Sequence, residues 1–350
     1  MKILIVKLGS IGDIVHTLPA LAAIHKRLPE AEISWVVEKR SAEILRGNPF
    51  ISRLIEIDTK SLRRKTNPRQ FLAQVRAELA QLRPGLGAKF DVALDFQGLL
   101  KSALVGKLSG AKKIYGFSSS SLKEPASRIF LSRSVRTSRR ANVILKNLNL
   151  ANRALKLKLP PPVPDELNFP IELKAAHLAE AADLISAVGG DFAILNPGGG
   201  WAAKLWPAER FGQLADRIWN DLGIASVVTY GPGEKDLADR AISASRSGKV
   251  YASSVSLKGF FALAQKARIY VGGDTGPTHL AVAAKTPVVG IFGPTEWWRN
   301  GSPRKDDIGV KRHDVKDHEC TRRPNSNCPC MDIDVDTVFQ AVRRRLEKIS

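Results

Sequence analysis

Short apolar runs alternate with amphipathic stretches along the chain, and most of the runs end in a turn that contains glycine. The first run, residues 2–8 (KILIVKL), predicts a buried strand, and residues 9–13 predict a tight turn into a helix over about residues 14–26. Further strands are predicted at residues 32–40, 90–98, 192–200, 225–233, 267–276 and 287–295. Alternating strands and helices imply parallel sheets with helices on both faces, which is the doubly wound α/β fold class.

A proline-rich stretch, residues 159–170 (LPPPVPDELNFP), separates two halves that both show this pattern. Proline cannot continue a helix or a central strand, so the stretch predicts a linker. We expect a Rossmann-like domain at residues 1–160, a linker at 161–172, a second Rossmann-like domain at 173–333, and a C-terminal helix at 334–350 that could pack back on the first domain. Ligands of such sheets bind beyond the carboxyl ends of the strands, so the glycine turns are expected to border a cleft between the domains.

Composition is that of a globular protein, with 350 residues, 44% hydrophobic and 25% charged. The first residues do not resemble a secretion signal, and no stretch approaches the ~18 uninterrupted apolar residues of a membrane-spanning helix. The three cysteines all fall between Cys320 and Cys330 and form no disulfide framework, which favours a reducing compartment. We therefore expect a cytoplasmic protein.

The chain is strongly basic, and its charged residues are unevenly distributed. The formal net charge is +20, and residues 60–140 hold 18 Lys or Arg against 4 Asp or Glu. An excess of this kind predicts an anionic partner. Nucleic acid, an anionic membrane face, and a phosphorylated or carboxylated substrate would each account for it.

The first candidate motif is residues 7–13 (KLGSIGD), at the end of the first strand. Its glycines allow the backbone to approach a ligand, and Asp13 offers a carboxylate where the helix begins. Asp13 could equally be a helix cap without chemistry. A dinucleotide fingerprint, with Glu38 on the ribose, is disfavoured because the G-x-x-G spacing lacks the close-approach glycine.

The second candidate is residues 196–206 (NPGGGWAAKLW), where three glycines expose backbone N–H groups and Lys204 adds a positive charge. Such a turn suits a diphosphate, although it lacks the order of residues of a Walker loop. The alternative is a glycine-rich loop with a solvated lysine.

Two further turns carry polar residues at strand ends. Residues 272–280 (GGDTGPTHL) are the densest polar cluster, and a helix N-terminus there would stabilise charge on a leaving phosphate. The alternative is that Asp274 and Thr275 only cap that helix and that His279 is a satisfied core histidine. Residues 230–236 (YGPGEKD) hold acids that could accept hydrogen bonds from ribose, although surface turns of this composition are common.

We expect no metal and no cofactor. Residues 332–336 (DIDVD) precede a final amphipathic helix, where acids complement the helix dipole, and no further ligands accompany them. Cys320, Cys328 and Cys330, with His313 and His318, do not have the spacing of a zinc site.

Together these motifs resemble the bacterial ADP-heptose:lipopolysaccharide heptosyltransferases, glycosyltransferases of the GT-B architecture with two Rossmann-like domains around a cleft. The resemblance is carried by ILIVKLGSIGDIVHTLPAL, DFQGLLKSALV, NPGGGWAAKLWP and GGDTGPTHLAVAAKTPVVGIFGPT. The first two blocks are most similar to the heptosyltransferase I branch.

The resemblance implies residue roles. Asp13 would be the catalytic base, and Lys204 would assist departure of the diphosphate. Donor contacts are implied for Gly199, Gly200, Lys204, Glu234, Val255, Asp274, Thr275, Gly276 and His279, with Asp236 an alternative to Glu234. Acceptor contacts are implied for Lys7, Gly12, Arg63, Arg64, Lys65 and Lys123.

The implied function is transfer of heptose from ADP-heptose to Kdo of Kdo2-lipid A, with inversion and without a metal, on the anionic cytoplasmic face of the inner membrane. Nucleic acid is not an expected partner. The alternatives are a heptosyltransferase acting on a later core position, a protein that binds anionic polymers without catalysis, and an NAD-dependent enzyme.

Overall fold

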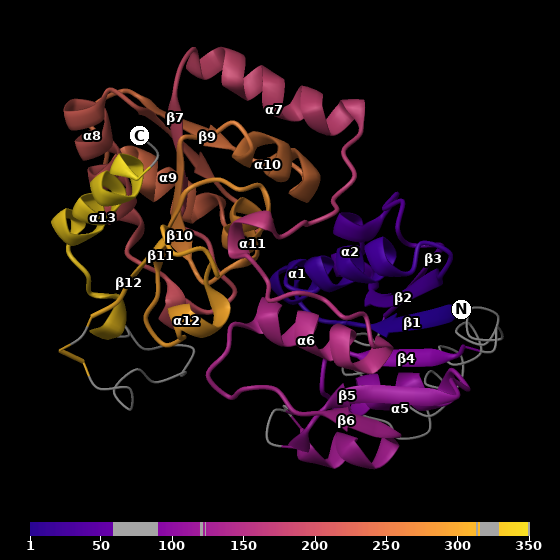
Figure 1. The fold of residues 1–350 in the computed structure, drawn as a ribbon. Helices are drawn as coiled ribbons and strands as arrows, with labels where there is room; N and C mark the ends of the chain where they lie inside the picture. Colours follow the sequence, from indigo (N-terminus) through magenta and orange to yellow (C-terminus); the bar gives the residue numbers. More distant parts are fainter. Residues whose placement is uncertain (59–89, 120–121, 123, 313, 316–328, 349–350) are drawn as a thin grey trace, which may run out of the picture. The chain divides into compact units, whose positions relative to one another are not determined.

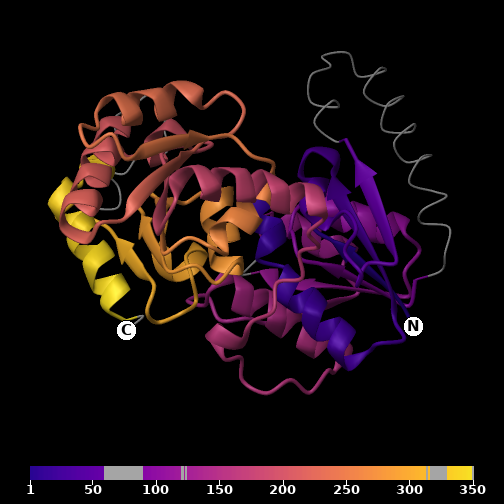
Figure 2. The same cartoon turned by 90° about the horizontal axis from the view of Figure 1, so that it is seen from above.

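The computed structural model describes residues 1–58, 90–119, 122, 124–312, 314–315 and 329–348. The chain divides into two compact units, residues 1–172 and 173–350. Each unit holds one sheet of six parallel strands with helices packed on it (Figure 1). Figure 2 shows the same elements from above.

The first unit has the strand order β3-β2-β1-β4-β5-β6, and every pairing is parallel. Its strands are β1 (Lys2–Val6), β2 (Glu32–Glu38), β3 (Arg53–Ile57), β4 (Val92–Asp95), β5 (Lys113–Phe117) and β6 (Arg133–Val135). Residues 3–6 of β1 are buried without interruption, because helices cover both faces of the sheet.

The described helices of this unit are α1 (Ile11–Val15), α2 (Leu18–Arg27), α5 (Leu100–Leu108) and α6 (Val143–Leu155), with 3₁₀ turns η1 (Lys39–Leu45), η3 (Pro125–Phe130) and η4 (Pro164–Glu166). The single helix expected after the first turn is thus two helices. Pro19 lies in the first turn of α2, where its missing N–H is tolerated. The chain bends at His16 and Thr17.

The second unit repeats the topology, with the order β12-β11-β10-β7-β8-β9. Its strands are β7 (Phe192–Asn196), β8 (Ala225–Thr229), β9 (Val250–Ser253), β10 (Ile269–Gly273), β11 (Val288–Ile291) and β12 (Ile308–Val310). Its helices are α7 (Ala175–Val188), α8 (Ala208–Leu222), α9 (Lys235–Ser243), α10 (Leu257–Ala264), α11 (Gly276–Ala283), α12 (Trp297–Asn300) and α13 (Val335–Glu347), with 3₁₀ turns η5 (Ala202–Lys204) and η6 (Pro329–Met331).

The C-terminal helix α13 packs on the second unit. Val338, Phe339 and Val342 are fully buried in the core that also holds strands β7, β10 and β11. Arg345 is buried against Asp307 at 2.8 Å. The sequence had left room for this helix to pack back on the first domain, but its apolar face belongs to the second core.

The proline-rich segment packs on the first unit. Asn48 Nδ2 donates to the Pro170 carbonyl at 2.7 Å, and Leu167 is buried with Ile144 and Leu148 of α6. Across the described part of the chain, no helix is long and apolar enough to cross a membrane.

Candidate active site

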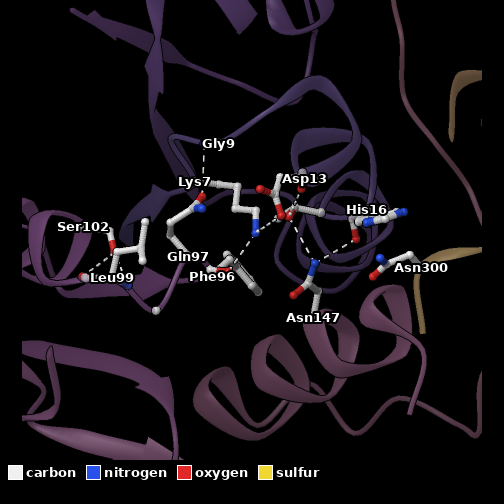
Figure 3. Close-up of polar contacts among 12 residues, drawn as sticks. Lys7, Gly9, Asp13, His16, Phe96, Gln97, Leu99, Ser102, Asn147 and Asn300 are labelled. Carbon is white, nitrogen blue, oxygen red and sulfur yellow. Dashed lines mark hydrogen bonds and ion pairs between the residues drawn. The ribbon is translucent and has the colours of Figure 1, made fainter. Parts of the chain in front are cut away.

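The carboxyl end of β1 carries a buried ion pair. Lys7 Nζ lies 3.1 Å from Asp13 Oδ1, and Lys7 also donates to the Phe96 carbonyl at 3.0 Å (Figure 3). The Lys7 side chain is 3% exposed, whereas that of Asp13 is 23% exposed. The lysine is therefore enclosed, and the carboxylate is partly exposed to solvent.

Gly9 makes room for the Asp13 carboxylate. A Cβ at position 9 would lie 2.4 Å from Asp13 Oδ2, well inside van der Waals contact. The Gly9 N–H donates to Gln97 Oε1 at 3.0 Å, which ties the turn after β1 to the turn after β4. The glycine is thus required by close approach, because any side chain here would push the carboxylate away.

The turn after β4 is organised by Asp95, which is fully buried. Its carboxylate accepts from the N–H groups of Gln97 and Gly98, at 2.9 and 3.1 Å, and from Ser102 Oγ at 3.1 Å. Burial raises the pKa of Asp95 above its ordinary value, although these hydrogen bonds act in the opposite direction. Asp95 fixes the loop that carries Gln97 and the Phe96 carbonyl.

The helix that bears Asp13 is also held from α6. Asn147 Nδ2 donates to the His16 carbonyl at 2.9 Å and to Thr17 Oγ1 at 3.1 Å (Figure 3). Thr17 Oγ1 in turn donates to the Asp13 carbonyl at 3.0 Å. These bonds satisfy the backbone where α1 breaks from α2 and fix the position of Asp13.

In the second unit, three candidate turns meet because β7 lies between β10 and β8. Lys204, in the loop after β7, lies 2.8 Å from Asp274 Oδ2, in the turn after β10. His279 Nε2 lies 3.2 Å from Asp274 Oδ1, and Asn300 Nδ2 donates to Asp274 Oδ2 at 3.2 Å. One carboxylate thus holds Lys204, His279 and Asn300.

Asp274 is an ionised centre in a nearly closed environment, since its side chain is 7% exposed. Burial alone would raise the pKa of Asp274, but the hydrogen bond and charge of His279, together with Lys204, outweigh burial and lower it below its ordinary range. The lysine and histidine are therefore held in fixed positions, where they could face an anionic ligand.

The turn between β10 and α11 is rigid. Thr278 Oγ1 donates to the Gly273 carbonyl and lies 2.9 Å from the Tyr270 hydroxyl, and both side chains are fully buried. Thr275 is the N-cap residue of α11, and Gly276 is its first residue. This places the free N–H groups of a helix N-terminus at the carboxyl edge of the sheet.

Glu234 occupies the turn after β8. Its Oε2 accepts the Gly231 N–H at 2.9 Å, and a Cβ at Gly198 would lie 2.2 Å from the same oxygen. The carboxylate therefore lies directly against the glycine loop after β7. Asp236 instead has an 83% exposed side chain and lies 3.9 Å from Arg240.

The remaining predicted donor residues lie around this edge. Gly199 is close to Thr275, since a Cβ at Gly199 would meet Thr275 Cγ2 at 3.3 Å, whereas Gly200 is open on that side. Val255 is half-buried in the loop between β9 and α10. Trp201, which the sequence did not single out, lies over Lys204 with the ammonium 4.9 Å from the ring centroid.

The predicted acceptor residues are only partly described. Arg63, Arg64, Lys65 and Lys123 lie outside the described residues. Gly12 is buried within α1. Lys7 is turned towards Asp13 and the Phe96 carbonyl.

The acidic side chains near the C-terminus make structural contacts. Asp334 caps α13 by accepting the Thr337 N–H at 2.7 Å, and Asp332 pairs with Arg210 at 2.6 Å. Among the described residues, no group of three or more His, Cys, Asp and Glu side chains could hold a metal ion.

Cys330 is 1% exposed and disulfide-bonded. Cys320 and Cys328 lie outside the described residues.

Two doubly wound sheets, each with a cluster of candidate turns at its carboxyl edge, have the GT-B architecture of the glycosyltransferases. Residues 79–330 match the model of glycosyltransferase family 9 (heptosyltransferase), and the chain belongs to this family.

Similar proteins of known name agree with this assignment. The chain is 29% identical over 296 residues to lipopolysaccharide heptosyltransferase 1 of Pseudomonas aeruginosa, which covers 84% of this chain and 79% of that protein. It is 29% identical over 299 residues to the protein of the same name from Escherichia coli K12, covering 85% and 89%.

Solved structures share the fold. The structure of E. coli heptosyltransferase WaaC with ADP superposes with a TM-score of 0.78 at 23% identity, covering 99% of this chain and all of that chain. The E. coli ADP-heptose heptosyltransferase II structure gives a TM-score of 0.75 at 17% identity, covering 100% and 99%.

Proposed function

We propose that the protein is an inverting heptosyltransferase that moves heptose from ADP-L-glycero-β-D-manno-heptose onto Kdo of Kdo2-lipid A during synthesis of the lipopolysaccharide inner core. The names of the relatives at 29% identity support the reaction, and structures of WaaC with ADP and with ADP-2-deoxy-2-fluoro heptose support a nucleotide-heptose donor. The observation that carries the proposal is Asp13, a partly exposed carboxylate fixed at the carboxyl edge of the first sheet.

Asp13 would act as the general base. A sugar hydroxyl is a weak nucleophile, and a carboxylate within hydrogen-bond reach removes its proton as the new glycosidic bond forms, a gain of about 10²–10⁴-fold. Gly9 leaves space for the Asp13 carboxylate, and Lys7 holds one of its oxygens. The partly exposed carboxylate would then meet the acceptor hydroxyl.

The second unit would bind the donor. When the bond to the anomeric carbon breaks, the ADP phosphate gains negative charge, and donors already fixed near it stabilise the transition state more than the ground state. Lys204, His279 and the N–H groups at Thr275 and Gly276 would supply this stabilisation. Glu234 would accept hydrogen bonds from the ribose hydroxyls, and Val255 would contact the adenine.

Metal independence is part of the proposal, because Lys204 and the α11 N-terminus would provide the positive charge that a metal ion provides in other transferases. The acceptor is expected to carry carboxylates and phosphates, which fits the basic first half of the chain. We assign the Kdo contacts to Arg63, Arg64, Lys65 and Lys123, with Gly12 beside the reacting hydroxyl. The protein would bind the acceptor at the anionic cytoplasmic face of the inner membrane.

The test is transfer from ADP-heptose to Kdo2-lipid A in the presence of EDTA, comparing the native chain with Asp13→Asn. We expect product from the native chain and a loss of about 10²–10⁴-fold in the variant, with ADP binding retained. Loss of native activity in EDTA that added magnesium restores would refute metal independence. Tight ADP binding without product would refute the acceptor, and an acceptor already carrying one heptose would then test a later core position.

A further inference from the structure

Helix α5 leaves a row of leucines in solvent. Leu100, Leu104 and Leu108 are 43%, 38% and 45% exposed. They are spaced four residues apart, so they lie on one face of the helix. The opposite face, with Ser102, Ala103, Val105 and Gly106, is buried. The helix is thus apolar on both faces, whereas a helix at the surface of a soluble protein usually has a polar outer face.

A further exposed apolar side chain lies on the 3₁₀ turn that packs against α5. Ile129 is 76% exposed and belongs to η3, which packs along α5. No other large hydrophobic side chain among the described residues has so high an exposed fraction. Leu100, Leu104, Leu108 and Ile129 are thus exposed on two elements that pack together, and we call this set of side chains the α5–η3 face. A contiguous exposed apolar surface marks an interaction site.

The surroundings of the α5–η3 face are cationic. Lys107 is exposed on the same side of α5 as Leu100 and Leu104, and Lys113 is exposed shortly after the helix ends. From residue 125 to residue 164 the chain carries nine Lys or Arg and no Asp or Glu.

The described acids near the α5–η3 face are already engaged. Glu124 Oε2 accepts the Leu100 N–H at 2.7 Å, Asp91 pairs with Lys112 at 2.7 Å, and Glu38 pairs with Lys101 at 3.2 Å. The exposed side chains of Lys107 and Lys113 therefore give the surroundings of the leucines a positive charge.

We propose that the α5–η3 face docks on an anionic lipid bilayer, with its four apolar side chains entering the boundary between headgroups and acyl chains and the surrounding cations lying at the headgroups. Apolar side chains bordered by lysine and arginine are the combination that binds an interface of this kind. Each cation near an anionic surface adds to the attraction, and salt screens that contribution. A second copy of the chain fits less well, because it would bring an equally basic surface to the same place.

This inference deepens the membrane partner named under the proposed function. Vesicle binding is measured without a transfer reaction, so failure of the docking face and failure of the transferase assignment are separate results. The probe is sedimentation of the full chain with vesicles of phosphatidylglycerol and phosphatidylcholine, and with vesicles of phosphatidylcholine alone.

The main variant combines Leu100→Gln, Leu104→Gln, Leu108→Gln and Ile129→Gln, and we expect its partition onto anionic vesicles to fall by at least about tenfold. The matched single variants are Leu108→Gln and Leu178→Gln, because Leu178 on α7 is 52% exposed. Only Leu108→Gln should weaken binding. For the charges, Lys107→Glu with Lys113→Glu should weaken binding more than Lys266→Glu, an exposed lysine of the second unit. Unchanged thermal midpoints and ADP binding show that the variants fold.

Three results would overturn the proposal. The first is a native chain that does not sediment with anionic vesicles, or that binds neutral vesicles equally well. The second is a folded four-site variant that binds like the native chain. The third is a native dimer in light scattering that the four-site variant converts to a monomer, which would assign the face to a second copy.

Discussion

Replacing Gly9 by alanine tests whether the position of the Asp13 carboxylate controls the reaction. The added Cβ would lie 2.4 Å from Asp13 Oδ2 and 2.9 Å from Asp13 Cβ, whereas ordinary contact begins at 3.4 Å. The carboxylate must therefore withdraw by about 1 Å, and a displacement of that size can lower a catalytic rate by about 10²-fold. We expect kcat for heptose transfer to fall by about this factor.

The assay follows ADP release with saturating ADP-heptose and Kdo2-lipid A, and ADP affinity is measured separately by calorimetry. ADP affinity should be unchanged, because Lys204 and Asp274 belong to the other unit. Gly190→Ala is the matched control, since a Cβ there meets nothing within 4 Å. A Gly9→Ala variant whose kcat stays within about threefold of the native value, while Asp13→Asn is inactive, would refute the reasoning about close approach.

Lys7→Met should lower kcat for transfer, because Asp13 loses the cation that lies 3.1 Å from its Oδ1, and an unchanged kcat would contradict this. Gly198→Ala should weaken ADP binding measured by calorimetry without changing the affinity for the acceptor, because the new Cβ would lie 2.2 Å from Glu234 Oε2. Asp274→Asn should make the thermal midpoint fall less steeply below about pH 4. The folded protein lowers the pKa of Asp274, so the ionised carboxylate stabilises the fold at pH values above its ordinary pKa of 3.8, and this stabilisation is lost as pH falls. Phe339→Ala, in the fully buried face of α13, should lower the free energy of unfolding of the second unit by about 3–5 kcal/mol in urea titrations.

The glycine turns and the strands before them were predictable because a parallel strand buried on both faces is an unbroken apolar run. Residues 3–6 and 192–195 have this form, and both are central strands. Parallel strands end at one edge, so the meeting of Lys204, Asp274 and Glu234 could also be expected once the strands were assigned.

The partners that fix the site could not be predicted in the same way. Lys7 reaches a carbonyl 89 residues further along the chain, and Asn147 reaches the His16 carbonyl across 131 residues. Such pairs depend on which strands are neighbours and on how the helices pack, and the local hydrophobic periodicity of the sequence predicts neither. The role of Asn300 could not be predicted either, because its hydrogen bond to Asp274 depends on the path of the loop after β11.

Asp95 shows a second limit. Asp95 lies within the strand predicted at residues 90–98, and an acid near the end of such a strand would suggest chemistry. The structure buries it completely and surrounds it with two backbone N–H groups and a serine hydroxyl. A motif alone does not separate an acid that organises a turn from one that meets a substrate, because exposure makes the difference.

The repeated strand order has a consequence for how such a chain can diversify. Each half folds around its own sheet, and the residues assigned to the acceptor and to the donor nucleotide lie on different halves. Substitutions that reshape the turns of the first sheet can therefore change which hydroxyl is glycosylated while the nucleotide pocket is inherited intact. A lineage can explore new acceptors one turn at a time, without having to rediscover how to hold and activate the donor.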